Sequence, residues 1–103
     1  MAGRRTHTAV RETRETRIAL DFDLDGTGKF AVTVPLMFLG HMVETLARFG
    51  GFDLKLEASG DNDHHVIEDV AITLGKSFRA ALAAGDPAIR RIGNATVPMD
   101  DAL

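Results

Sequence analysis

The chain has 103 residues, of which 45% are hydrophobic and 26% charged, with a formal net charge of −3 and no cysteine. This balance argues against disorder and predicts one small globular domain spanning residues 1–103. The charge gives no reason to expect nucleic acid or an acidic membrane as a partner. The lack of cysteine excludes disulfides and thiolate metal ligands within this chain. No apolar run is long enough to span a membrane and the first residues do not resemble a signal peptide, so we expect a cytoplasmic protein.

Three strands are predicted before the first helix. Residues 17–24 alternate between apolar and polar side chains, which is typical of a half-buried strand. The turn signal Asp25-Gly26-Thr27-Gly28 separates them from a second alternating stretch, residues 29–34, and together they predict a β-hairpin. Residues 6–14 are rich in Thr and Val and predict a further strand in front of this hairpin.

Two amphipathic helices are predicted in the second part of the chain. The first follows Pro35 and ends at Gly50 and Gly51. The second begins near residues 61–63, any of which could cap it, and ends at about Ala84. The expected buried stripe of the first helix is Leu39, Met42, Val43 and Leu46. The expected buried stripe of the second helix is Val66, Ile67, Val70, Leu74 and Phe78.

Two more strands complete the expected fold. Residues 52–58 alternate again, and a last short strand is expected at about residues 90–97. The predicted order is β-β-β-α-β-α-β. It favours a single α+β domain of two layers, in which one mainly antiparallel sheet of four or slightly more strands carries both helices on one face.

The stretch DNDHHVIED, residues 61–69, holds two of the four histidines. On a helical wheel with His64 at 0°, Glu68 falls at about 40° and His65 at about 100°, whereas the apolar stripe covers roughly 200–340°. The three side chains therefore face away from the core, as His41 does on the polar face of the first helix. Spacing leaves two readings open: a divalent metal site built from imidazole and carboxylate, or the polar first turn of a helix. A metal site would need further ligands, which we expect from another chain.

Four sequence blocks carry a resemblance to a known family. They are RETRETRIALDFDLDGTGKF, GHMVETLARFGGFDLKLEASGD, DHHVIEDVAITLG and PMDDAL. In order and spacing these blocks resemble imidazoleglycerol-phosphate dehydratase, an enzyme of histidine biosynthesis, along nearly the whole chain. The family's chain is longer and consists of two similar halves, each with its own HHxxE motif. This chain resembles the first half, which implies one half of the duplicated dehydratase fold.

The resemblance implies a reaction and a metal. The family eliminates water from imidazole glycerol phosphate to give imidazole acetol phosphate, which is carbon–oxygen lyase chemistry. It uses manganese held by His and Glu from both halves and from neighbouring subunits, with the substrate imidazole bound to the metal as imidazolate. Zinc or ferrous iron would also suit imidazole ligands. The positions that match the family's metal ligands are His41, His64, His65 and Glu68.

Two further residues match functional positions of the family. Glu15 matches a glutamate implicated in acid–base chemistry, and Arg91 matches approximately an arginine that helps to hold the substrate phosphate. The neighbouring Arg90 remains an alternative to Arg91. Without the resemblance, Glu15 reads as an exposed strand carboxylate and Arg91 as a solvated surface charge.

The chain also departs from the family pattern. Gly40 stands where the family usually has Asp, Val66 stands where it commonly has Thr, and the segment before His64 is shorter. We therefore expect a metal-dependent dehydratase whose site is completed between copies of a self-associating chain, or with a separate second-half chain. The alternative is a catalytically inactive metal-binding or structural half-domain: a fragment, an ancestor-like protein or one part of a split enzyme.

Overall fold

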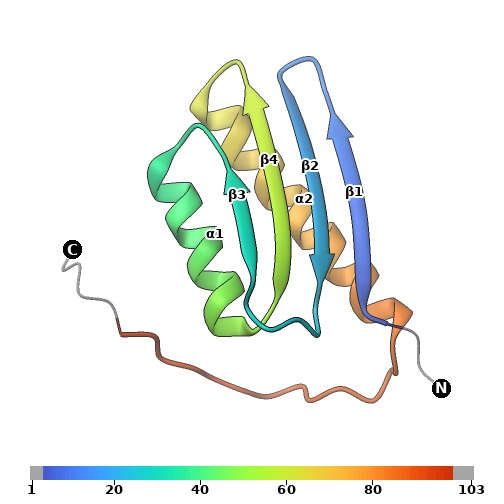
Figure 1. Cartoon of the computed structure of the whole chain (residues 1–103). Coiled ribbons are helices and arrows are strands. Elements are labelled where there is room, and N and C mark those ends of the chain that lie inside the picture. Colours follow the sequence, from blue (N-terminus) through green and yellow to red (C-terminus); the bar gives the residue numbers. More distant parts are fainter. Residues whose placement is uncertain (1–3, 99–103) are drawn as a thin grey trace.

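The computed structural model describes residues 4–98 as a four-stranded sheet with two helices on one of its faces (Figure 1). The strands are β1 (Thr6–Glu12), β2 (Thr16–Asp23), β3 (Phe30–Thr33) and β4 (Asp53–Gly60). The helices are α1 (Met37–Gly50) and α2 (Asp63–Ala84). The predicted two-layer α+β domain is confirmed. From Met99 onward, the PMDDAL block lies outside the described residues.

The predicted hairpin between β2 and β3 is wrong. The sheet order is β1-β2-β4-β3, so β4 lies between them, antiparallel to β2 and parallel to β3. The turn after β2 is bonded to the start of β4: Oδ1 of Asp53 accepts the backbone N–H groups of Thr27 and Lys29, each at 2.9 Å. The backbone carbonyl of Lys29 in turn accepts the N–H of Leu54 at 3.0 Å. The sheet is therefore mixed, and β3-α1-β4 forms a parallel crossover.

The predicted last strand is also wrong. Helix α2 ends at Ala84, as predicted. Residues 85–98, which follow it, contain no strand (Figure 1). An extended segment becomes a strand only when its backbone groups pair with a sheet edge, and the described residues show no such pairing here. The observed order is β-β-β-α-β-α.

The core lies between the sheet and the helices. Alternate side chains of β2 and β4 point into it, as the period-two patterns predict. Its buried apolar residues are Ile18, Leu20, Phe22, Val43, Ala47, Leu54, Leu56, Val66, Val70 and Ala81. No helix among residues 4–98 is long and apolar enough to cross a membrane.

The buried face of α1 differs from the predicted stripe. Val43 is buried as expected, but it is joined by two small residues, Gly40 and Ala47. A Cβ at Gly40 would lie 3.2 Å from Cγ2 of Val34, so this glycine lets the helix lie close to the chain leaving β3, which offsets its poor helix propensity. Because α1 packs through this small-residue face, the expected core residues Met42 and Leu46 turn outward.

The outward residues form a second apolar stripe, which we call the α1 apolar stripe. It consists of Phe38, Met42, Leu46 and Phe49, with exposed fractions of 61%, 39%, 44% and 58%. On α2 the prediction is likewise only partly correct, since Val66 and Val70 are buried but Ile67 and Phe78 stay substantially exposed. The helix layer therefore presents apolar side chains to solvent on both helices.

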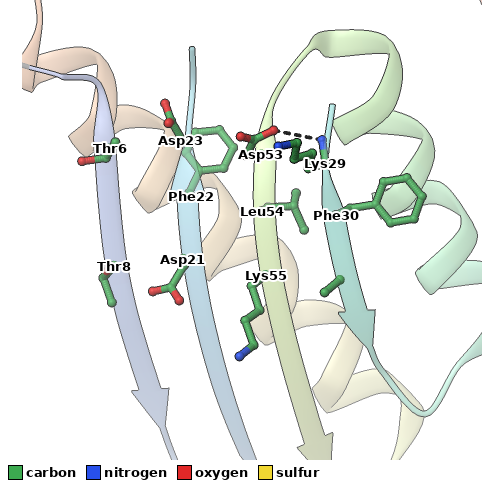
Figure 2. Close-up of a pocket in the computed structure, with 11 residues that line it drawn as sticks. Thr6, Thr8, Asp21, Phe22, Asp23, Lys29, Phe30, Asp53, Leu54 and Lys55 are labelled. Carbon is green, nitrogen blue, oxygen red and sulfur yellow. Dashed lines mark hydrogen bonds between the residues drawn. The ribbon is translucent and has the colours of Figure 1, made fainter. Parts of the chain in front are cut away.

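The other face of the sheet is not covered by helices and is largely polar. A shallow depression of about 460 Å³ lies on this face. Figure 2 shows side chains that line it, such as Thr8, Asp21 and Lys55. It extends to the Asp53–Lys29 hydrogen bond, at the end of the sheet where β3 and β4 begin. This is the end of the sheet remote from the histidines of residues 61–69, so the depression is separate from the candidate site.

Candidate metal centre

Five of the candidate site residues lie at one end of the domain. Because β1, β3 and β4 all run in the same direction, the β1–β2 turn and the first turns of both helices meet at the end where these strands finish (Figure 1). This end carries Glu15, His41, His64, His65 and Glu68. The fold thus brings together, at one edge, residues that are far apart in the sequence.

The start of α2 exposes His64 and Glu68. Asn62 is the N-cap, with an extended backbone and a side-chain oxygen that accepts the N–H of His65 at 3.0 Å. One turn apart, Nε2 of His64 and Oε2 of Glu68 are 3.3 Å from each other, and both side chains are exposed. A nitrogen and an oxygen donor therefore sit side by side in solvent, within reach of one ion.

His65 is oriented by a carboxylate that the sequence analysis did not single out. Its Nδ1 lies 2.7 Å from Oδ1 of Asp61. An ionised carboxylate can only accept, so Nδ1 donates, and in the neutral ring Nε2 keeps its lone pair. Ligating histidines commonly have this arrangement, with the second nitrogen held by a carboxylate. The i, i+4 spacing of Asp61 and His65 is the signal that could have identified the pair.

His41 lies on the exposed polar flank of α1, with its ring centroid 6.4 Å from that of Phe38. Within residues 4–98, no three His, Cys, Asp or Glu side chains come close enough together to hold a metal ion. The structure therefore places the four sequence-predicted ligands at one end without assembling them into a complete coordination group in one chain.

Glu15 lies at the end of the domain that carries the histidines, whereas Arg91 does not. Glu15 belongs to the β1–β2 turn, and its backbone carbonyl accepts the N–H of Asp61 at 2.9 Å, which ties the turn to the start of α2. Arg91 lies in segment 85–98, which leaves α2 at the opposite end of the domain (Figure 1). Within one chain, Arg91 is therefore not brought to the histidines.

The charge around His65 gives a direct test of this geometry. The hydrogen bond that His65 donates to Asp61 is the main cause that raises the pKa of His65 above its ordinary value of 6.5; desolvation opposes this rise, and the charges of Asp61, Glu15 and Glu68 add to it. The pair therefore stabilises the fold fully below pH 6.5, and this contribution is lost as the pH rises through the raised pKa.

We expect Asp61→Asn to lower the pKa of His65, because an amide neither attracts the imidazolium charge nor accepts as strongly. An NMR titration of the His65 ring measures the change. Asp63→Asn is the matched control: it removes the same charge from the first turn of α2, at a residue that does not contribute to the His65 shift. A His65 pKa that is equal in the two variants would contradict the assigned pair.

Comparison with known proteins identifies the family. The family model of imidazoleglycerol-phosphate dehydratase matches residues 34–103. The chain is 53% identical over 98 residues to the imidazoleglycerol-phosphate dehydratase of Methanothermobacter thermautotrophicus, an alignment covering 91% of this chain and 50% of that protein. It is 52% identical over 98 residues to that of Aromatoleum aromaticum (91% and 49% covered) and 50% identical over 106 residues to that of Lactococcus lactis (96% and 52%). The chain thus spans about half the length of the curated relatives it matches. With more than half of its length matched by the family model, the chain belongs to the imidazoleglycerol-phosphate dehydratase family.

Proposed function

We propose that this chain is a metal-binding half of a dehydratase that converts imidazole glycerol phosphate to imidazole acetol phosphate and water in the cytoplasm. The observation that carries the proposal is the incomplete cluster at the start of α2. His64 and Glu68 offer a nitrogen and an oxygen 3.3 Å apart, and Asp61 orients His65. These side chains are of metal-ligand types and lie on an exposed surface, and residues 4–98 do not supply enough further ligands to complete a site.

The donor set fits a divalent ion that accepts imidazole and carboxylate together. Manganese is the metal we propose, and zinc or ferrous iron would suit the same ligands. His64, His65 and Glu68 of one copy, with His41 of another, would hold it. When bound, the ion would supply positive charge that stabilises an anionic imidazole ring of the substrate.

The remaining chemistry needs residues that move protons and hold phosphate. Glu15 is the proposed proton-transfer residue, because it lies at the same end of the domain as the proposed metal ligands. Its negative charge also contributes to the raised pKa of His65. Arg91 is the proposed phosphate contact, and it would serve the site of a neighbouring copy, since in its own chain it leaves the domain at the other end.

Self-association is the proposed way to complete the site. The α1 apolar stripe runs along the same helix that carries His41, and it exposes four large apolar side chains beside the polar flank. Exposed apolar patches of this kind typically mark interfaces. We propose that a second copy of this half-domain covers the stripe, in keeping with the twofold greater length of the relatives.

The test combines metal binding, assembly and turnover. The metal-free chain is titrated with manganese by calorimetry, its mass is followed by size-exclusion chromatography with light scattering, and formation of imidazole acetol phosphate is measured. Manganese binding by an oligomer, with turnover, is the expected result. A monomer that does not bind manganese would overturn the proposal. An oligomer that binds manganese without turnover would favour the alternative, a catalytically inactive metal-binding half-domain, and a requirement for an added second-half chain would identify a split enzyme.

A further inference from the structure

A partly buried polar network joins the turn that carries Glu15 to helix α2. The RETRET block, residues 11–16, supplies three side chains to it: Arg11, Thr13 and Thr16. Helix α2 supplies Asp69, whose side chain is directed toward the sheet and is only 8% exposed as a residue. None of these four residues is among the proposed ligands or proton donors.

Asp69 is the acceptor at the centre of the network. Its Oδ2 accepts the Thr16 hydroxyl at 2.5 Å, and its Oδ1 accepts Nε of Arg11 at 3.0 Å. A buried carboxylate held by two donors fixes both of them tightly.

The hydrogen bonds have a single consistent direction. Thr16 has one hydroxyl proton, and it goes to Asp69. In the 3.2 Å contact between the two threonine hydroxyls, Thr13 must therefore be the donor. The Thr13 oxygen in turn accepts the backbone N–H groups of Glu15 at 3.1 Å and Thr16 at 3.0 Å. The carboxylate of Asp69 thus controls, through two hydroxyls, the backbone that presents the Glu15 side chain.

Close packing supports the same connection. A Cβ at Gly60 would lie 2.6 Å from Cγ2 of Val66, 2.9 Å from Cγ2 of Thr16 and 3.0 Å from the carbonyl oxygen of Glu15. The turn and the start of α2 therefore approach each other across a residue with no side chain.

We propose that Thr16 and Asp69 are positioning residues, which hold Glu15 beside His65 at the end of the domain where the metal ligands lie. This inference rests on the proposed function for the role of Glu15. The linkage itself stands on the hydrogen bonds and packing above, and it can be tested whether or not the chain is active.

The experiment compares Thr16→Val with Thr16→Ser. Valine has the shape of threonine without the hydroxyl, so it removes the donor to Asp69 and the acceptor for Thr13, whereas serine keeps both. The readout is amide hydrogen exchange at Asp61, whose N–H is bonded to the Glu15 carbonyl. We expect exchange about tenfold faster in Thr16→Val, as for loss of a hydrogen bond to a charged group, and near-parental exchange in Thr16→Ser. The Val70 amide in the middle of α2 reports global unfolding and should change little.

Turnover provides the functional readout. In the manganese-loaded protein, Thr16→Val should lower kcat about tenfold and leave the affinity for manganese unchanged. Thr16→Ser should have the kcat of the parent. Asp69→Asn, which keeps the shape of the side chain, should reproduce the valine result if Thr16→Val does not fold. Unchanged Asp61 exchange in Thr16→Val and Asp69→Asn would overturn the linkage, and faster exchange with undiminished turnover would overturn the positioning role. An inactive parent would count against the proposed function, while the exchange result would still decide whether the turn is held.

Discussion

Replacing both His64 and His65 with alanine is expected to weaken manganese binding by more than about 100-fold, measured by calorimetry on the metal-free protein. Loss of a single carboxylate that orients a ligand typically costs 10- to 100-fold, and this change removes two direct ligands at once. The fold should survive, because both side chains are largely outside the core and Asn62 still caps α2.

The matched control is His7→Ala, which removes a histidine from β1, away from the start of α2. It should leave manganese affinity unchanged, and circular dichroism should show that both variants keep their helices. If the double variant bound manganese as tightly as the parent, the candidate centre would not be the metal site, whatever the activity of the chain.

A carboxylate placed in the α1 apolar stripe is expected to break self-association. Leu46→Asp puts a charge among apolar side chains that a second copy would cover. Burial of a polar group without a partner costs roughly 2 kcal/mol or more, so the dissociation constant should rise at least about 30-fold. Sedimentation velocity over a range of concentrations measures the shift toward monomer.

Ser59→Asp is the matched control for this change. It adds the same charge at an exposed position on β4, away from α1. If Leu46→Asp and Ser59→Asp associated equally well, the stripe would not be the interface. If manganese binding is lost together with association in Leu46→Asp but not in Ser59→Asp, the metal ligands come from two copies.

Local pattern was sufficient for most elements but not for their pairing. Alternation identified β2 and β4, and glycine ended α1 where predicted. The hairpin error arose because alternation describes a strand's two faces and not its neighbours. The decisive contact comes from Asp53, more than twenty residues beyond the turn, whose side chain bonds Thr27 and Lys29. No local signal in the turn distinguishes this closure from a hairpin.

The helices show a related limit. A helical wheel ranks residues by polarity, so it placed Met42 and Leu46 in the core and passed over Gly40. Close packing of α1 instead favours the face whose side chains are smallest, because the backbone can then approach Val34. Helix α1 has two apolar faces, the one with Gly40, Val43 and Ala47 and the α1 apolar stripe. Both can be seen in the sequence, but only the three-dimensional arrangement decides which of them is buried.

The candidate site was predictable to different degrees. Helical spacing correctly placed His64, His65 and Glu68 away from the core, because all three belong to one continuous helix. It did not reveal Asp69 as the partner of Thr16, since their contact joins residues 53 positions apart. The roles of these residues as metal ligands stay predictions, as do those of His41, Glu15 and Arg91.

The two apolar stripes of α1 also affect how the stability of this chain can be measured. If one stripe is buried within the domain and the other between copies, unfolding a molecule requires the assembly to separate as well. The midpoint of thermal unfolding would then rise with protein concentration, as mass action requires for a folded state that binds itself. For such a chain, folding and assembly would be parts of a single equilibrium.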